Sequence, residues 1–126
     1  TPTAERVLFT YTYAVQLLAA AMYKEAVPQF SMVIRKLPDY AQAYHGRGLA
    51  HYHEEQYALA LEDFDKAIEL KPDLAVAYRN RGILHVSMNS MFRAVADLEK
   101  ALGLYEASGQ RRQAENIRAL ITGTAR

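Results

Sequence analysis

The sequence nearly repeats itself every 34 residues. Pro38-Asp39 recurs as Pro72-Asp73, and Arg47-Gly48 recurs as Arg81-Gly82. Three further ladders share this spacing: Ala26, Ala60 and Ala94; Phe30, Phe64 and Leu98; Ile34, Ile68 and Leu102. A fixed period of this size indicates stacked copies of one supersecondary unit. Such an array offers an extended surface to a partner, whereas an enzyme usually needs a closed pocket.

Each repeat predicts helices rather than strands. In the second unit, apolar residues recur three and four positions apart, as on one face of a helix: Tyr44, Ala50, Tyr57, Ala60, Leu61, Phe64, Ala67 and Ile68. The hairpin signals Asn-Gly and Asp-Gly are absent from the sequence. Pro38 and Pro72 each predict the end of a helix, because proline lacks an N–H and biases the residue before it away from helical geometry. We therefore expect an all-α chain with helices at about residues 4–20, 23–37, 41–54, 57–70, 75–88, 91–107 and 110–122.

The third unit departs from the pattern at its end. Glu106 takes the place of the helix-stopping proline, so we expect the helix to continue to Ser108 and to stop at Gly109. The segment that follows is polar apart from one apolar stripe: Ala114, Ile117, Leu120 and Ile121. A helix of this kind closes the end of a repeat array, whose stacking surface would otherwise be exposed.

The repeat resembles the tetratricopeptide repeat, a 34-residue helix–turn–helix unit. The second unit supplies the family's signature positions most fully: Tyr44, Arg47, Gly48, His51, Ala60, Phe64, Ala67 and Pro72. The third supplies Tyr78, Arg81, Gly82, His85, Ala94, Leu98 and Ala101. The first is the weakest, with Thr10, Tyr13, Ala14, Leu17, Ala26, Phe30, Val33 and Pro38. The resemblance implies a right-handed α-solenoid and a single domain over residues 1–126, with repeats at about 7–40, 41–74 and 75–108 and a capping helix at about 110–122.

Small residues of the pattern have a packing role in the family. Gly48 and Gly82 are expected where the two helices of a unit approach most closely, and Ala60 and Ala94 are expected opposite them. His51 and His85 occupy a position where the family has tyrosine, so we expect them in the core or at an interface between helices. These residues are therefore packing residues in the prediction and not candidates for recognition.

The resemblance also implies a concave groove lined by the first helix of each unit. The candidate groove residues are Leu8, Tyr11, Val15, Leu18, Gln42, His45, Leu49, Tyr52, His53, Arg79, Asn80 and Ile83. They are apolar and aromatic toward the N-terminus, and polar with one cation toward the C-terminus. A groove of this kind suits an amphipathic helix or an extended peptide with hydrophobic anchors. An error of one helix position in this assignment would place some of these residues in the core instead.

Chaperone-binding members of the family hold the C-terminal carboxylates of a peptide with a clamp of Lys, Asn and Arg side chains. The matching positions here are Tyr11, Val15, Gly46, Val76 and Asn80. These positions provide no charged fork that could pair with a carboxylate. We therefore expect no recognition of Hsp70 or Hsp90 tails in that mode.

The sequence contains no pattern that predicts catalysis or metal binding. His51 and His53 are two positions apart and point to different sides of a helix, so they are poorly placed to share a metal ion. Acidic residues of the second helices alternate with lysines, as on a solvated convex face: Glu62, Asp63, Asp65, Glu69, Asp97 and Glu99. The phosphate loop, G-x-S-x-G and H-E-x-x-H motifs are absent. We therefore expect no enzyme, no catalytic residue, no metal and no cofactor.

Composition narrows the range of partners. Lys and Arg total 15 and Asp and Glu total 14, a net charge of +1 that gives no electrostatic reason to expect nucleic acid or an anionic membrane. The longest apolar run, Tyr13–Tyr23, falls well short of the roughly 20 residues that span a bilayer. The chain has no cysteine, which fits a reducing, cytoplasmic compartment.

The leading hypothesis is therefore a non-catalytic module that binds a protein or peptide in the groove. The first helix lacks the polar face of a surface helix, so it needs either an upstream repeat or another subunit to cover it. The alternative is therefore a structural module that forms a homo-oligomer through this helix. Its apolar residues are Val7, Leu8, Phe9, Tyr11, Tyr13, Val15, Leu17 and Leu18. RNA binding is a third and weaker hypothesis, since Arg79 is the one permanent cation among the candidate groove residues.

Overall fold

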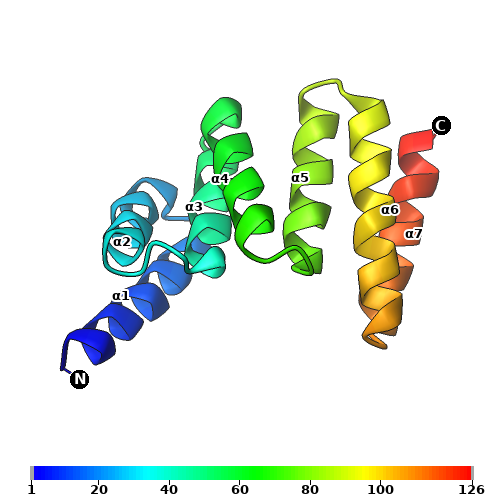
Figure 1. The fold of residues 1–126 in the computed structure, drawn as a ribbon. Coiled ribbons are helices and arrows are strands. Elements are labelled where there is room, and N and C mark those ends of the chain that lie inside the picture. The colour runs from blue at the N-terminus through cyan, green and yellow to red at the C-terminus, as the bar shows by residue number, and fades with distance from the viewer. Residues whose placement is uncertain (1, 126) are drawn as a thin grey trace. The chain divides into compact units, whose positions relative to one another are not determined.

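The computed structural model describes residues 2–125, and over that range the chain consists of helices joined by short turns, without strands (Figure 1). The helices are α1 (Pro2–Ala19), α2 (Tyr23–Lys36), α3 (Ala41–His53), α4 (Tyr57–Leu70), α5 (Ala75–Ser87), α6 (Met91–Ala107) and α7 (Arg111–Ala125). The predicted all-α class is confirmed. The predicted bounds agree to within a few residues, and the largest difference is at the end of α7.

The turns inside the repeats share one backbone form. Three residues at 34-residue spacing have positive φ angles of 61°, 59° and 60°: Ala21, Glu55 and Asn89. After each of them, an N–H returns to a carbonyl five residues earlier, as from Gln56 to His51 at 2.8 Å, which is the hydrogen bond of a Schellman helix end. Gly109, with φ of 73°, ends α6 in the same way, as predicted. Ala21 and Glu55 have no intrinsic preference for this conformation, so the pattern of hydrogen bonds at the helix end imposes it.

Residues 1–70 form one compact unit, which contains α1 to α4. Its core consists of Val7, Ala14, Leu17, Ala26, Phe30, Val33, Ala43 and Ala50. Phe30 is fully buried, and its ring lies so close to Gly46 of α3 that a Cβ atom there would overlap it. Gly46 therefore packs against α2 and does not present a surface to a ligand. In this unit α1 packs on α2, α2 on α3 and α3 on α4.

The predicted close approach of two helices within a repeat is confirmed. A Cβ atom at Gly48 would lie 2.8 Å from Cε1 of Phe64. A Cβ atom at Gly82 would lie 3.0 Å from Cγ of Leu98 and 3.2 Å from the carbonyl oxygen of Ala94. Real Cβ atoms rarely approach other heavy atoms so closely, so glycine is what allows these helix pairs to pack at this distance.

Residues 71–126 form the second compact unit, which contains α5, α6 and α7. Its core consists of Leu98, Ala101, Tyr105, Ala114 and Ile117. The last two belong to α7 and are 2% and 0% exposed, whereas Arg111, Arg112 and Glu115 of the same helix are exposed. The helix α7 thus has an apolar stripe packed on α6 and a solvated opposite face, as predicted for a helix that caps the array.

Candidate functional site

In the first unit, α1 presents four candidate residues on one face: Leu8, Tyr11, Val15 and Leu18. Leu8 and Val15 are 55% and 39% exposed, and the other two pack partly against the core. The Tyr11 ring lies edge-on to Phe30 at 6.0 Å and to Tyr40, just before α3, at 5.1 Å. Burial raises the pKa of Tyr11, so its phenol stays neutral. This stripe combines exposed aliphatic side chains with a fixed aromatic support, and α1 contacts α3 directly.

On α3, four candidates are partly buried and one is exposed: Gln42, His45, Leu49 and Tyr52, and then His53. The Tyr52 ring lies 5.8 Å from the ring of Tyr57 and 5.3 Å from that of His53. His53 in turn stacks on Tyr23, with ring centroids 4.5 Å apart and planes within 11°. Because Tyr23 and Tyr57 are the first residues of α2 and α4, Tyr52 and His53 belong to an aromatic cluster at the C-terminal end of α3.

His45 contributes packing as well as surface. Its ring lies 5.8 Å from that of Phe64. Burial lowers the pKa of His45 to about 4. At neutral pH the imidazole is therefore uncharged.

In the second unit, α5 carries the remaining candidates: Arg79, Asn80 and Ile83. Arg79 Nη1 donates a hydrogen bond of 2.8 Å to Oδ1 of Asn80, which is only 8% exposed. Burial raises the pKa of Tyr105 in α6, and the nearby positive charge of Arg79 opposes that shift. Asn80 thus supports Arg79, and the partly exposed Arg79 and Ile83 form the surface of this stripe.

Each unit contains a buried ion pair that the residue pattern did not predict. Arg47 Nε and Nη2 donate to the two carboxylate oxygens of Asp63 at 2.9 and 2.8 Å, and Arg81 binds Asp97 in the same way at 2.8 Å for both bonds. The carboxylates belong to residues that are 5% and 7% exposed. The prediction of a solvated convex face is therefore wrong for Asp63 and Asp97. Asp63 follows Ala60 by three positions and so shares its buried helix face.

Two histidines complete these ion pairs. His51 Nε2 lies 3.8 Å from the Asp63 carboxylate, and His85 Nε2 lies 3.6 Å from that of Asp97. Burial lowers the pKa of His51, the Asp63 charge opposes this, and the Arg47 charge adds to it. A third bond from Arg47, Nη1 to Ser31 Oγ at 3.1 Å, ties the network to α2. The polar groups of this network bind one another, so we interpret the network as one that stabilises the fold.

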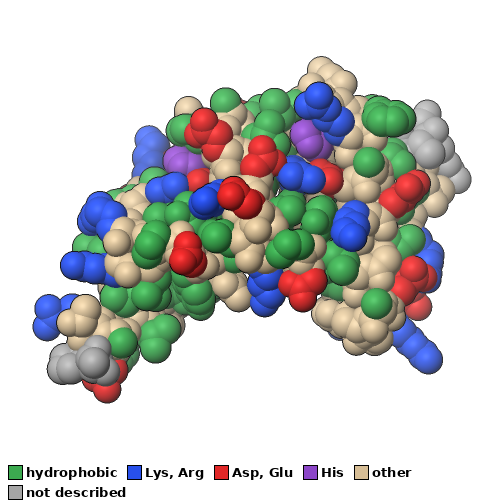
Figure 2. Space-filling model, viewed as in Figure 1, with side chains coloured by type: hydrophobic (Ala, Val, Ile, Leu, Met, Phe, Trp, Pro, Cys, Tyr) green, Lys and Arg blue, Asp and Glu red, His purple; other side chains and the backbone are tan. Residues whose placement is uncertain are grey.

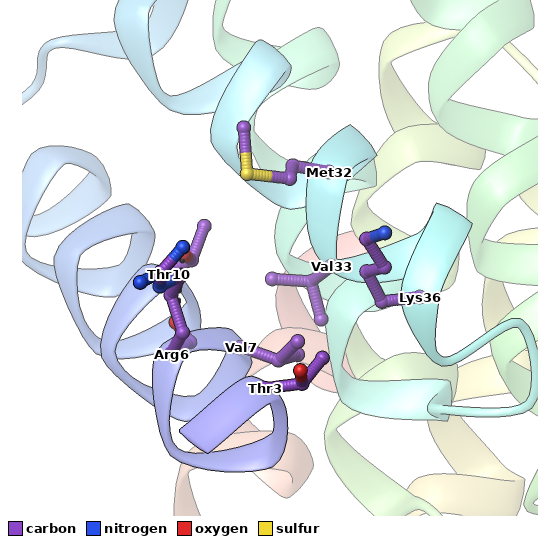
Figure 3. A pocket seen from close by; sticks show the side chains of 7 residues that line it. All are labelled: Thr3, Arg6, Val7, Thr10, Met32, Val33 and Lys36. Carbon is purple, nitrogen blue, oxygen red and sulfur yellow. Dashed lines mark hydrogen bonds between the residues drawn. The ribbon is translucent and has the colours of Figure 1, made fainter.

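A cavity of about 190 Å³ lies between α1 and α2 (Figure 3). Its lining residues are Thr3, Arg6, Val7, Thr10, Met32, Val33 and Lys36. Val7 and Val33 point toward one another across its floor (Figure 3). None of the predicted groove residues lines this cavity. One signal for it does exist in the sequence, because Thr10 stands where the later repeats have Tyr44 and Tyr78.

Charges of both signs are interspersed on the face that Figure 2 shows, with hydrophobic side chains among them. Within residues 2–125, no three His, Asp or Glu side chains gather in a way that could hold a metal ion. Over the same range, no helix combines the length and the apolar character needed to cross a lipid bilayer.

Residues 41–74, which contain α3 and α4, match the family model of the tetratricopeptide repeat. The chain contains a tetratricopeptide repeat. No curated protein sequence matches it. The tetratricopeptide-repeat fold extends over the rest of the chain, because solved structures of such domains superimpose on nearly all of it.

Three solved structures illustrate this likeness. The TPR2B domain of yeast Sti1, in complex with pHsp70, has a TM-score of 0.90 at 19% identity and covers 96% of this chain and 97% of its own. PcrH, in complex with the chaperone binding region of PopD, has a TM-score of 0.88 at 15% identity over 98% of this chain and 92% of its own. MamA from Desulfovibrio magneticus RS-1 has a TM-score of 0.74 at 28% identity, and the match covers 78% of this chain but 55% of the MamA chain. At these identities the likeness concerns the fold.

Proposed function

We propose that this protein is a non-catalytic interaction module whose first unit binds a partner peptide or helix on the α1 stripe and the adjoining α3 residues. One observation carries the proposal. Leu8 and Val15 are 55% and 39% exposed on a stripe that is otherwise anchored in the core. A partner that covers these exposed apolar side chains removes their surface from water, which favours binding.

The chemistry of this surface defines the partner. The exposed aliphatic residues favour an apolar side chain of the ligand, and the amide of Gln42 can hydrogen-bond its polar groups. Taken by itself, the second unit offers a ligand the apolar side chain of Ile83 and the positive charge of Arg79. A single interface of this kind is expected to give a Kd of about 1–100 μM.

The same surface disfavours the two-carboxylate clamp. Of the clamp positions, Gly46 is buried and has no side chain, Val76 is apolar, and Asn80 is engaged by Arg79. A carboxylate at the end of a peptide would find no charged fork at these positions. We therefore expect apolar anchors, rather than a C-terminal carboxylate, to determine peptide selection.

Selection from a library of random peptides, followed by fluorescence anisotropy with the enriched peptides, tests this proposal. The variant Leu8→Ser/Val15→Ser is expected to weaken binding about tenfold, which corresponds to about 1.4 kcal/mol. The matched control is Leu59→Ser on α4, which is 44% exposed and lies outside the stripe. Equal affinities for the α1 variant and the wild type would refute the assignment of the site.

A second candidate function, self-assembly through α1, is favoured by a different observation. Phe9 and Tyr13 are 76% and 50% exposed on α1. The position equivalent to Phe9 in the second repeat is Ala43, which is fully buried in the cluster that contains Phe30. The corresponding face of α1 therefore carries an exposed phenyl ring, which a second copy of the chain would cover.

Light scattering over a series of protein concentrations tests self-assembly. A dimer is expected, and Phe9→Ser should shift it toward monomer. Phe92→Ser is the control, since Phe92 is 90% exposed in the second unit. A mass that stays monomeric at the highest concentration would eliminate this candidate.

A further inference from the structure

The cavity between α1 and α2 occupies a place that an aromatic ring fills in the later repeats. Thr10, Tyr44 and Tyr78 stand at the same position of their repeats, 34 residues apart. Tyr78 packs on the core cluster that contains Ala101, and Lys100 Nζ lies 6.0 Å from the centre of its ring. Both contact residues correspond, two repeats earlier, to residues that line the cavity.

Residues of the third repeat that surround Tyr78 correspond to residues of the first repeat that line the cavity. Lys100 corresponds to Met32 and Ala101 corresponds to Val33, and both Met32 and Val33 line the cavity. Thr10 itself lines it as well, and its hydroxyl donates to the carbonyl oxygen of Arg6 at 2.9 Å, so the side chain is held back against its own helix. The first repeat therefore has no aromatic ring at the position where the second and third repeats have Tyr44 and Tyr78.

The rest of the cavity explains why the space stays open. Tyr44 and Tyr78 reach over to the turn before their helix and donate to the carbonyl oxygens of Pro38 and Pro72 at 2.9 and 3.0 Å. In the first repeat that turn is replaced by the first turns of α1, whose Thr3 and Arg6 form a wall of the cavity. Valines at positions 7 and 33 narrow the floor but do not fill it.

We propose that this cavity is a binding site, distinct from the α1–α3 surface, for an aromatic side chain of a peptide with a carboxylate close to the ring. The volume of about 190 Å³ is larger than the roughly 150 Å³ of an engineered apolar cavity that takes up benzene. The floor is apolar, as an aromatic face requires. Arg6 and Lys36 line the cavity, and neither has an ion-pair partner among residues 2–125, so they are available to a carboxylate and to the face of the ring.

The equivalent ring in the later repeats has cationic neighbours too. Arg81 Cζ lies 5.6 Å and Lys100 Nζ 6.0 Å from the centre of the Tyr78 ring. An aromatic side chain beside Arg6 and Lys36 would thus reproduce an environment that this protein already provides for its own tyrosines. An aliphatic ligand would fill the floor but would lose the interaction with the cations.

Titration of the full chain with N-acetyl-tyrosine, observed through the methyl groups of Met32, Val7 and Val33 by NMR, tests the proposal. A Kd on the order of 1 mM is expected for a ligand of this size. N-acetyl-tyrosinamide, without the carboxylate, and N-acetyl-leucine, without the ring, are each expected to bind several-fold more weakly. Lys36→Gln should remove the preference for the acid over the amide, whereas Lys24→Gln, at the opposite end of α2, should leave it unchanged.

Filling the cavity from within provides the decisive variant. Thr10→Tyr is expected to abolish the ligand-induced shifts and to raise Tm by about 4 °C, because it supplies the missing ring. Thr10→Val keeps the cavity open and should bind like the wild type. Shifts that persist in Thr10→Tyr, an affinity for N-acetyl-leucine equal to that for N-acetyl-tyrosine, or methyl shifts that follow protein concentration without any ligand would each overturn the proposal. The last outcome would mean that a second copy fills the cavity.

Discussion

Arg47 on α3 and Asp63 on α4 form a two-bond ion pair, with Nε–Oδ2 and Nη2–Oδ1 distances of 2.9 and 2.8 Å. The side chains are 24% and 7% exposed. The hydrogen bond to Asp63 is the main reason that the pKa of Arg47 is raised. Because the carboxylate is nearly buried, each partner depends on the other for compensation of its desolvation.

Asp63→Asn is therefore expected to destabilise the protein by about 2 kcal/mol. The loss is smaller than the 3–5 kcal/mol of a fully buried pair because water reaches part of Arg47. Urea denaturation measures it, with Glu99→Gln on the exposed face of α6 as the control, which should change the free energy of unfolding by less than about 0.5 kcal/mol. An equally small change for Asp63→Asn would show that the ion pair contributes little.

Gly48→Ala and Gly103→Ala are expected to act in opposite directions. At Gly48 a methyl group would lie 2.8 Å from the buried ring of Phe64, and the overlap should cost about 1–3 kcal/mol, more than alanine gains in helix propensity. At Gly103 no heavy atom lies within 4 Å, so alanine should stabilise the helix by up to about 1 kcal/mol. Thermal unfolding monitored by circular dichroism compares the two, and equal signs would contradict the packing argument.

We expect the protein to lose stability in mild acid because His45 is buried. Its pKa is lowered from 6.5 to about 4 by burial, so between these values the unfolded chain binds a proton that the folded chain does not. Stability is fully present above pH 6.5 and decreases as the pH falls toward 4, with a loss of about 2 kcal/mol from this group at pH 5. His45→Gln should flatten the dependence in urea denaturation at pH 7 and pH 5. His53→Gln, at an exposed position, should retain it, and identical slopes for both variants would refute this cause.

Leu49→Ala combined with Tyr52→Ala is expected to weaken a selected peptide by tenfold or more, because both side chains are partly exposed on α3 beside the α1 stripe. Helicity measured by circular dichroism should remain, since the interior of α3 keeps Ala43, Gly48 and Ala50 in place. Unchanged affinity in fluorescence anisotropy would remove α3 from the binding surface.

Much of the helical organisation follows from the repeat itself. The period of 34 residues, the prolines at 38 and 72 and the glycine at 109 mark turns that the structure confirms. Gly82 lies close to Ala94, as the repeat pattern predicts, whereas the side chains nearest to Gly48 are those of Phe64 and Asp63. These features are local or periodic, so a single sequence contains enough information to predict them.

Two details of the candidate site could not be predicted from the sequence. Asp63 looked like one acidic residue among several on a helix with alternating charges, and only the packing of α4 against α3 shows that it is buried and paired with Arg47. His45 was predicted as a surface residue, but its ring packs near Phe64 and its pKa is lowered by burial. Both errors have one cause, since the rotation of a helix about its axis cannot be read to within one residue from spacing alone.

The sequence alone predicts the class of the fold and the repeat register, because both depend on periodic contacts between residues close along the chain. It also revealed that Thr10 differs from Tyr44 and Tyr78. The consequence of that difference depends on how the helices pack. Whether a missing ring leaves a cavity depends on α1 and α2 closing around it, with Val7 and Val33 as the floor and Arg6 and Lys36 beside it. Side chains from two helices together determine the shape of such a space, so the residue pattern of one helix cannot predict it.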